Sequence, residues 1–279
     1  MINEQDKFNR FLEDEFALLM RREFNTVIND LKEEESKNIN DINESIENKR
    51  TLFTNYTELI LYLDANNGNT NDYLKYDYVT LYGILGEAYF QREMYDESIK
   101  ALDKAISMSP SNILLIQRKM FALKKLNLID DLEKLLYKTF KYCYTRDALM
   151  NQYALLANVF EEKKMYKESA YILYLIGVSF DNNAACLKEI DRMQKKTNEL
   201  YNCPNYDELM GFLKEKNIMS PYDLYTYYYS FYTDMIKNND TLGALDFLKC
   251  CNNVFYDKKG EKKIKKLSKQ IEKARKKQE

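Results

Sequence analysis

Two segments of this chain share one sequence pattern at a fixed separation. Residues 92–106 read REMYDESIKALDKAI and residues 163–177 read KKMYKESAYILYLIG, so each carries Met-Tyr-x-Glu-Ser at the same place. Their tyrosines, Tyr95 and Tyr166, lie 71 positions apart. Repetition of this kind is typical of stacked units, each of which buries its apolar face against its neighbours. The chain is therefore expected to fold as a repeat protein.

The first copy, residues 79–112, has aromatic, apolar and small residues at regular places, namely Tyr82, Leu85, Gly86, Tyr89, Ser98, Leu102, Ala105 and Pro110. In these positions it resembles a repeat of the tetratricopeptide family. Two of that family's periods of about 34 residues fit between the tyrosines with three residues to spare. Small residues such as Gly86 let two antiparallel helices approach closely. Pro110 is expected to end the second helix, and Ser111 or Asn112 can cap the next one.

Further copies follow in the same phase. Residues 113–146 form an eroded copy, because Lys119 and Met120 replace the usual Leu-Gly pair. After a three-residue insertion, residues 150–183 match well, and a fourth copy is expected at 225–258. The resemblance implies antiparallel helix hairpins stacked into a short right-handed superhelix with helical caps.

The flanks are predicted from helical periodicity. Apolar residues from Ile39 to Leu63, interrupted only by Lys49, predict one helix, and an earlier apolar stripe predicts another. These helices make residues 1–66 a hairpin cap, or alternatively a coiled coil for self-association. Residues 67–78 are expected to form a loop, residues 184–256 irregular helices with a break at 202–205, and residues 257–279 a basic helix.

Composition agrees with an all-α fold. The chain has 279 residues, of which 45% are hydrophobic, so it can bury a core. Only 7 glycines and 3 prolines are present, far fewer than the tight turns of a β-sandwich would require. The Ser220-Pro221 pair, with Asp223 after it, is typical of a helix start. Long helices are the expected element throughout.

Catalysis is not expected. The chain has no histidine, its five cysteines form no CxxC pair, and it carries no nucleophile-elbow or phosphate-loop motif. No cofactor, metal or small-molecule substrate is therefore predicted. Scattered cysteines favour a reducing, cytoplasmic compartment, and the polar residues after Met1 do not read as a secretory signal.

The resemblance implies a concave groove lined by the first helix of each repeat. The groove residues that follow from it are Glu87, Phe90, Gln91, Gln117, Phe121, Lys124, Lys125, Asn158, Glu161 and Glu162. Such a mixture can hold an extended peptide or a helix of a partner protein. Alternatively, the protein's own flanking helix fills the groove. The expected function is that of a non-catalytic scaffold or adaptor.

The alternative function is binding of nucleic acid or an anionic membrane surface through the basic tail. Residues 257–279 contain eleven Lys or Arg against four acidic residues. The tyrosine-rich segment 220–233 could stack on bases, but no Lys or Arg is interleaved with it, so a structural role is favoured there. A solvated capping helix is the other interpretation of the tail.

Overall fold

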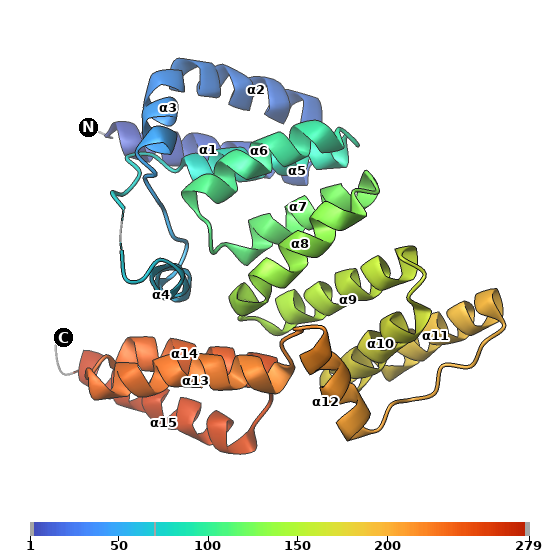
Figure 1. The fold of residues 1–279 in the computed structure, drawn as a ribbon. Helices are drawn as coiled ribbons and strands as arrows, with labels where there is room; N and C mark the ends of the chain where they lie inside the picture. The colour runs from blue at the N-terminus through green and yellow to red at the C-terminus, as the bar shows by residue number, and fades with distance from the viewer. Residues whose placement is uncertain (1–2, 70, 277–279) are drawn as a thin grey trace. The chain divides into compact units, whose positions relative to one another are not determined.

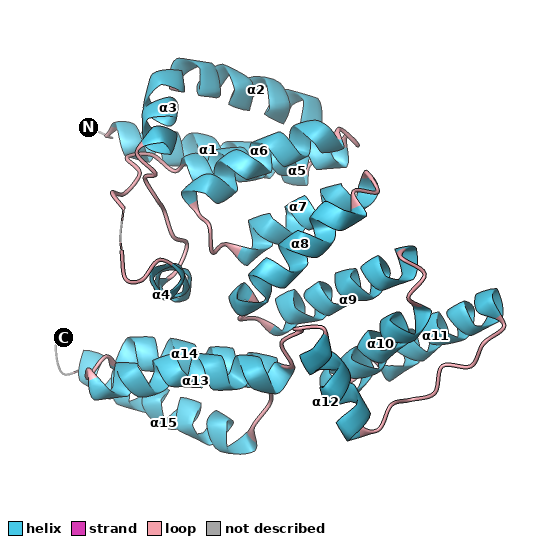
Figure 2. Cartoon of the chain, in the orientation of Figure 1, coloured by secondary structure: helices cyan, strands magenta, loops and turns pink. Residues whose placement is uncertain are grey.

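The computed structural model of the chain describes residues 3–69 and 71–276. Helices are the only regular elements in these ranges, apart from one isolated bridge between Thr51 and Tyr73, so the predicted all-α class is confirmed (Figures 1 and 2). None of the described helices combines the length and the apolar character that crossing a membrane requires. Contacts divide the chain into two compact units, residues 1–131 and 132–279, and the boundary falls within α8 (Ile129–Thr139).

The helices of the first unit are α1 (Glu4–Met20), α2 (Phe24–Lys37), α3 (Ile39–Glu47), α4 (Tyr56–Ala65), α5 (Tyr78–Gln91), α6 (Tyr95–Met108) and α7 (Ile113–Lys125). The unit contains two complete helix pairs, α1–α2 and α5–α6, and most of a third, α7–α8. The short helices α3 and α4 lie between the first two pairs in the sequence. Helix α5 packs against α1, α2, α6 and α7. Asn112 accepts hydrogen bonds from the first N–H groups of α7, which confirms the predicted cap.

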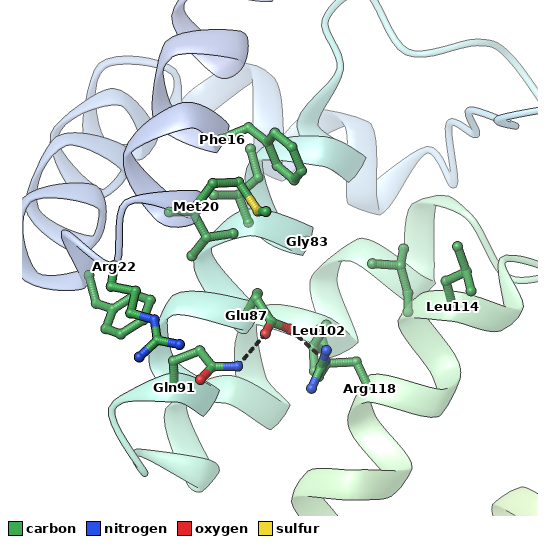
Figure 3. A pocket seen from close by; sticks show the side chains of 13 residues that line it. Phe16, Met20, Arg22, Gly83, Glu87, Gln91, Leu102, Leu114 and Arg118 are labelled. Atoms are coloured by element: carbon green, nitrogen blue, oxygen red, sulfur yellow. Dashed lines mark hydrogen bonds and ion pairs between the residues drawn. The ribbon is translucent and has the colours of Figure 1, made fainter. Parts of the chain in front are cut away.

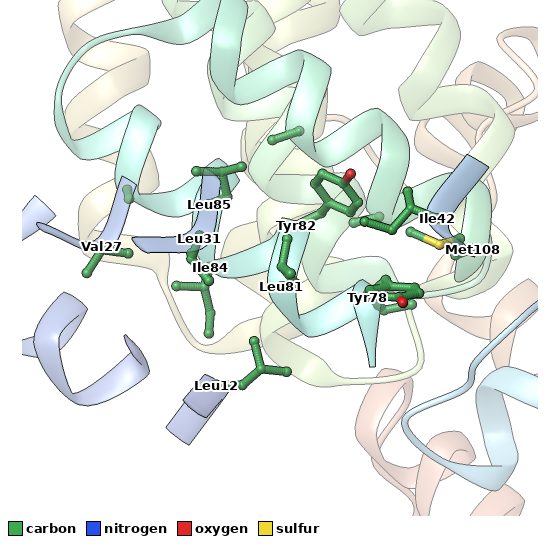
Figure 4. Packing of buried hydrophobic residues seen from close by; sticks show 14 of the residues in the cluster. Leu12, Val27, Leu31, Ile42, Tyr78, Leu81, Tyr82, Ile84, Leu85 and Met108 are labelled. Atoms are coloured by element: carbon green, nitrogen blue, oxygen red, sulfur yellow. The ribbon is translucent and has the colours of Figure 1, made fainter. Parts of the chain in front are cut away.

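The core of the first unit surrounds α5 (Figure 4). This helix is almost entirely apolar in sequence and is buried on most of its sides. Tyr78 and Tyr82 are fully buried, and their hydroxyl groups donate to Asp41 and Glu35, both at 2.7 Å. Buried tyrosines require such partners, because an unpaired hydroxyl group would lose its hydrogen bonds to water.

The second unit continues with paired helices. It contains most of α8, a 3-10 turn (Phe140–Tyr142), α9 (Arg146–Glu162), α10 (Tyr166–Phe180), α11 (Asn183–Thr197), α12 (Tyr206–Glu215), α13 (Pro221–Lys237), α14 (Thr241–Val254) and α15 (Lys258–Arg275). Helix α10 packs on α9 and α11, and α14 packs on α13 and α15. The predicted break at 202–205 separates α11 from α12. Ser220 caps α13 reciprocally with Asp223, as the sequence predicts.

One three-residue turn recurs in five helix pairs of the described ranges, namely α1–α2, α5–α6, α7–α8, α9–α10 and α13–α14. The middle residues have φ of 57° to 65° and are Arg22, Glu93, Asn127, Lys164 and Asn239. The next N–H donates to the carbonyl five residues back, as from Met94 to Tyr89 at 3.0 Å. This bond satisfies a carbonyl group that the helix end leaves free. Arg22, Glu93 and Lys164 are spaced evenly by 71 positions, so the turn follows the sequence repeat.

A serine contact repeats at the same spacing. The Ser98 hydroxyl donates to the Gly86 carbonyl, and the Ser169 hydroxyl donates to the Ala157 carbonyl, both at 2.8 Å. Both serines are buried, and each bond joins the two helices of one hairpin. Close approach is required for this contact, and a Cβ at Gly86 would lie only 2.7 Å from the Leu102 side chain. The second-helix serine and the small first-helix residue therefore act as a pair in both copies.

The predicted helix from Ile39 to Leu63 is wrong, because α3 ends at Glu47 and α4 begins at Tyr56. Lys49, the residue that interrupts the apolar stripe, has φ of 52°. The segment that follows pairs outside the helices, since the Leu52 N–H donates to the Met108 carbonyl at 2.9 Å. The described residues 3–66 thus form four helices rather than one hairpin. The apolar periodicity continues across the segment between α3 and α4, although its backbone hydrogen bonds join residues far apart in the sequence.

Candidate partner-binding cleft

The first unit contains a cleft of about 860 Å³ among α1, α5 and α7 (Figure 3). These are the first helices of the three helix pairs that this unit contains, wholly or in part. The lining residues are Phe16, Leu19, Met20, Arg22, Phe24, Gly83, Ile84, Glu87, Gln91, Leu102, Leu114, Leu115 and Arg118. Two of the predicted groove residues, Glu87 and Gln91, are therefore among them.

Exposed apolar side chains line the mouth of the cleft. Phe16 is 53% exposed, and Met20 and Leu114 are each 69% exposed. The deeper wall contains the buried side chains of Leu19 and Leu102. Isolated exposed apolar residues are ordinary on a protein surface, but three that line one concavity are typical of a binding surface.

Gly83 opens the floor of the cleft. It lies in the middle of α5, and a Cβ there would lie 3.1 Å from the Leu115 side chain. A glycine inside a helix costs about 1 kcal/mol relative to alanine, so its presence here has a packing reason. The absent side chain lets the cleft reach the α5 backbone between α1 and α7.

A polar row lies along the cleft. The Gln91 side chain donates to the Glu87 carboxylate at 2.7 Å, and Arg118 forms an ion pair with the same carboxylate (Figure 3). The Arg118 guanidinium also lies 4.8 Å from the Phe90 ring centroid, which orients it. Within the described ranges Arg22 forms no ion pair, so the cleft holds one uncompensated positive charge. An acidic group on a ligand is therefore favoured near Arg22.

A second cleft of about 570 Å³ extends along α1 from the first. Phe16 lines both, and Thr80 of α5 lines the second together with Gln5, Asn9 and Tyr76. Together the two clefts give an elongated surface, which suits an extended peptide or a helix better than a compact small molecule.

Several predicted groove residues do not face this cleft. Gln117 is 4% exposed and lies in the core rather than on a groove surface, which corrects its assignment. Phe90 is half-buried against Tyr95, at 5.4 Å between ring centroids. Three more predicted residues lie at the end of α7 and do not line the cleft: Phe121, which is half-buried, and Lys124 and Lys125, which are exposed. No local signal in the sequence shows which predicted residues line the cleft and which do not. For Gln117, Phe121, Lys124 and Lys125, the outcome depends on which side of α7 faces α5.

The predicted groove residues of the second unit lie on α9. Glu161 accepts two hydrogen bonds from the Arg192 guanidinium of α11, at 2.9 and 2.6 Å, and Lys196 lies 3.6 Å away. Arg192 holds the pKa of Glu161 below its usual value. Asn158 is half-buried and Glu162 is exposed. At Glu161 the chain's own helix therefore occupies the predicted groove, so this carboxylate is not offered to a partner.

Four important lining residues were missed from the sequence, namely Phe16, Met20, Arg22 and Arg118. The first three belong to α1 and its turn, which the sequence suggested were only a cap. The available signal was weak: Arg21 and Phe24 precede Arg92 and Tyr95 by 71 positions, the spacing of the two recognised copies.

Cys143 and Cys251 are buried cysteines of the second unit. Burial raises the pKa of the Cys143 and Cys251 thiols, the latter to about 12, so both stay protonated near neutral pH. Within residues 3–69 and 71–276 no three acidic or cysteine side chains gather in a way that could hold a metal ion. No protein-family model matches the chain, and no curated protein matches it at a significant level.

Proposed function

We propose that this chain is a non-catalytic scaffold of the tetratricopeptide repeat type that holds a peptide or helix of a partner protein. The recurring turn and the paired serine contacts support the repeat assignment. The observation that carries the binding proposal is the α1–α5–α7 cleft, with Phe16, Met20 and Leu114 exposed at its mouth. We also propose a cytoplasmic location, which the scattered free cysteines support.

The partner segment that fits this cleft has apolar side chains at intervals along one face and an acidic group near Arg22. Apolar anchors surrounded by a polar rim are the usual source of affinity in such grooves. The Glu87–Arg118 pair and Gln91 offer polar contacts to the edge of the segment. Specificity would then come from the spacing between the apolar anchors and the acidic group.

A double variant tests the proposal. Met20→Asp with Leu114→Asp places charge on two exposed anchors, so the helices should stay folded by circular dichroism. Burying each anchor contributes about 1.5–3 kcal/mol, so the dissociation constant of the partner should rise by at least about a hundredfold. The partner is first recovered with the wild-type chain from the native cell, and it is then titrated by calorimetry.

The matched control is Val178→Asp with Leu200→Asp. These side chains are 72% and 81% exposed and lie in the second unit, outside the cleft. The control should bind as the wild type does. If the Met20/Leu114 variant binds the partner as tightly as the control variant does, the cleft is not the binding site. The same conclusion follows if both variants lose affinity to the same extent.

A further inference from the structure

A row of tyrosines lies on one side of α13. Tyr222, Tyr225, Tyr229 and Tyr232 follow each other at three- and four-residue steps, so they share a helix face. The rings of Tyr222 and Tyr225 are nearly parallel at 6.2 Å between centroids, and those of Tyr225 and Tyr229 at 5.6 Å. None of the four is buried, and Tyr222 is 56% exposed. Tyr225, Tyr229 and Tyr232 are half-buried, so the tyrosine row is a partly accessible surface.

Phe255, directly after α14, extends the row, and Tyr256 follows it in the sequence. The Phe255 ring meets Tyr222 and Tyr225 edge-on, at 5.7 and 5.9 Å between centroids. Phe255 is 44% exposed and Tyr256 is 61% exposed. Aromatic rings usually withdraw from water, so the exposed and mutually contacting rings of Tyr222 and Phe255, beside half-buried tyrosines, are typical of a binding surface.

Lysines from α15 lie beside the tyrosine row. The Lys263 ammonium donates to the Tyr229 hydroxyl at 3.3 Å and lies 5.4 and 5.8 Å from the ring centroids of Tyr229 and Tyr232. Lys259 and Lys266 are one turn away on either side, so they share its helix face. The sequence shows no basic residue interleaved with the tyrosines, whereas the fold supplies one from a helix more than thirty positions later.

The charge on this face is largely uncompensated. Lys265 is the only basic residue of the described part of α15 with a side-chain ion pair, to Glu261 at 2.6 Å. Lys259, Lys263 and Lys266 are exposed. Positive charge that is not neutralised within the protein is available to an anionic ligand.

We infer that the tyrosine row and the Lys259–Lys263–Lys266 face together bind single-stranded nucleic acid. Bases stack on aromatic rings whatever their sequence, while ammonium groups beside the rings contact the phosphates. Both chemical requirements occur here at contact distance, on helices that pack as one group. This activity goes beyond the peptide-binding role proposed for the first unit and involves none of its residues.

A membrane surface fits this face less well. A helix that lies in a bilayer interface needs its apolar side free to enter the acyl region. The apolar residues of α15, Ile264, Leu267 and Ile271, are half-buried, and the helix packs on α14, whereas the lysines are exposed. The side of α15 that would have to enter lipid is therefore turned toward the protein.

The test is fluorescence anisotropy with labelled twenty-nucleotide oligo-dT and oligo-U and the full chain. Replacing Lys259, Lys263 and Lys266 with serine should lower the slope of log K against log salt by about 2, because each phosphate contact in a single strand contributes about 0.7. Tyr222→Ala should raise the dissociation constant by at least about fivefold. Circular dichroism checks that both variants are folded.

A matched triple variant, in which Lys138, Lys188 and Lys214 become serine, removes equal charge from exposed positions on α8, α11 and α12. It should keep the wild-type affinity and slope. The inference is overturned by an absence of oligonucleotide binding, by an equal loss in both triple variants, or by binding to phosphatidylserine vesicles without binding to oligonucleotides. Because the cleft residues stay unchanged, partner binding by the first unit is a separate result.

Discussion

Glu15 is a buried carboxyl group whose ionisation should control the stability of the first unit. It lies on the buried side of α1, is 3% exposed, and its Oε2 has no hydrogen-bond partner within the described ranges. Burial, reinforced by the charges of Asp30 and Asp14, raises the pKa of Glu15 from 4.5 to about 7. The charged form is therefore disfavoured in the folded state.

The sign of the pH effect follows from proton binding. Between pH 4.5 and about 7 the folded chain keeps the Glu15 proton while the unfolded chain has lost it, so the free energy of unfolding falls as the pH rises. At roughly 1.4 kcal/mol per pH unit, the full effect is about 3 kcal/mol above pH 7. Glu15→Gln removes the titration and should recover most of this amount at pH 8 and little at pH 4.

Urea unfolding of the full chain at pH 4, 6 and 8 measures the effect. The matched control is Glu13→Gln, an exposed carboxyl group on the same helix, which should change the free energy of unfolding by less than about 0.5 kcal/mol at every pH. The reasoning is refuted if Glu15→Gln stabilises equally at pH 4 and pH 8. It is equally refuted if the two variants have the same pH profile.

Four further substitutions test the helix packing and one helix cap. Gly86→Ala should lower the free energy of unfolding by about 1–2 kcal/mol, because the clash of the new Cβ with Leu102 exceeds the gain in helix propensity. Unchanged stability in denaturant melts would contradict the close approach of α5 and α6 at Gly86. Ser98→Ala and Ser169→Ala should each cost about 1 kcal/mol in the same melts, and clearly different values would argue against equivalent roles. Ser220→Ala should cost about 1 kcal/mol through the lost cap and speed hydrogen exchange in the first turn of α13, while Ser230→Ala on the exposed side should do neither.

The repeat made much of the helix pattern predictable, because its residues act locally. Tyr95 and Tyr166 each begin the second helix of a hairpin, and the boundaries of α5, α6, α9 and α10 follow. The helix expected from Ile39 to Leu63 failed since backbone bonds such as Leu52 to Met108 join segments far apart in the sequence. Periodicity does not report such contacts, and only the interruption at Lys49 hinted at the break.

The site was less predictable than the fold. Glu87 and Gln91 were found because position within a repeat fixes which side of α5 they face. Gln117 and Glu161 were assigned by the same rule, yet one is buried and the other is held by Arg192, since neighbouring helices decide what stays accessible. Lys263 joins the tyrosine row only through tertiary packing, which no spacing in the sequence encodes.

The most direct test of the central claim is hydrogen–deuterium exchange of the chain with and without its bound partner segment. We predict added protection in α1, α5 and α7, strongest around Met20, Gly83 and Leu114, which line the cleft. The exchange of α9 and α10 should not change. Protection confined to other helices, or the same exchange in the free and bound states, would contradict binding in the α1–α5–α7 cleft.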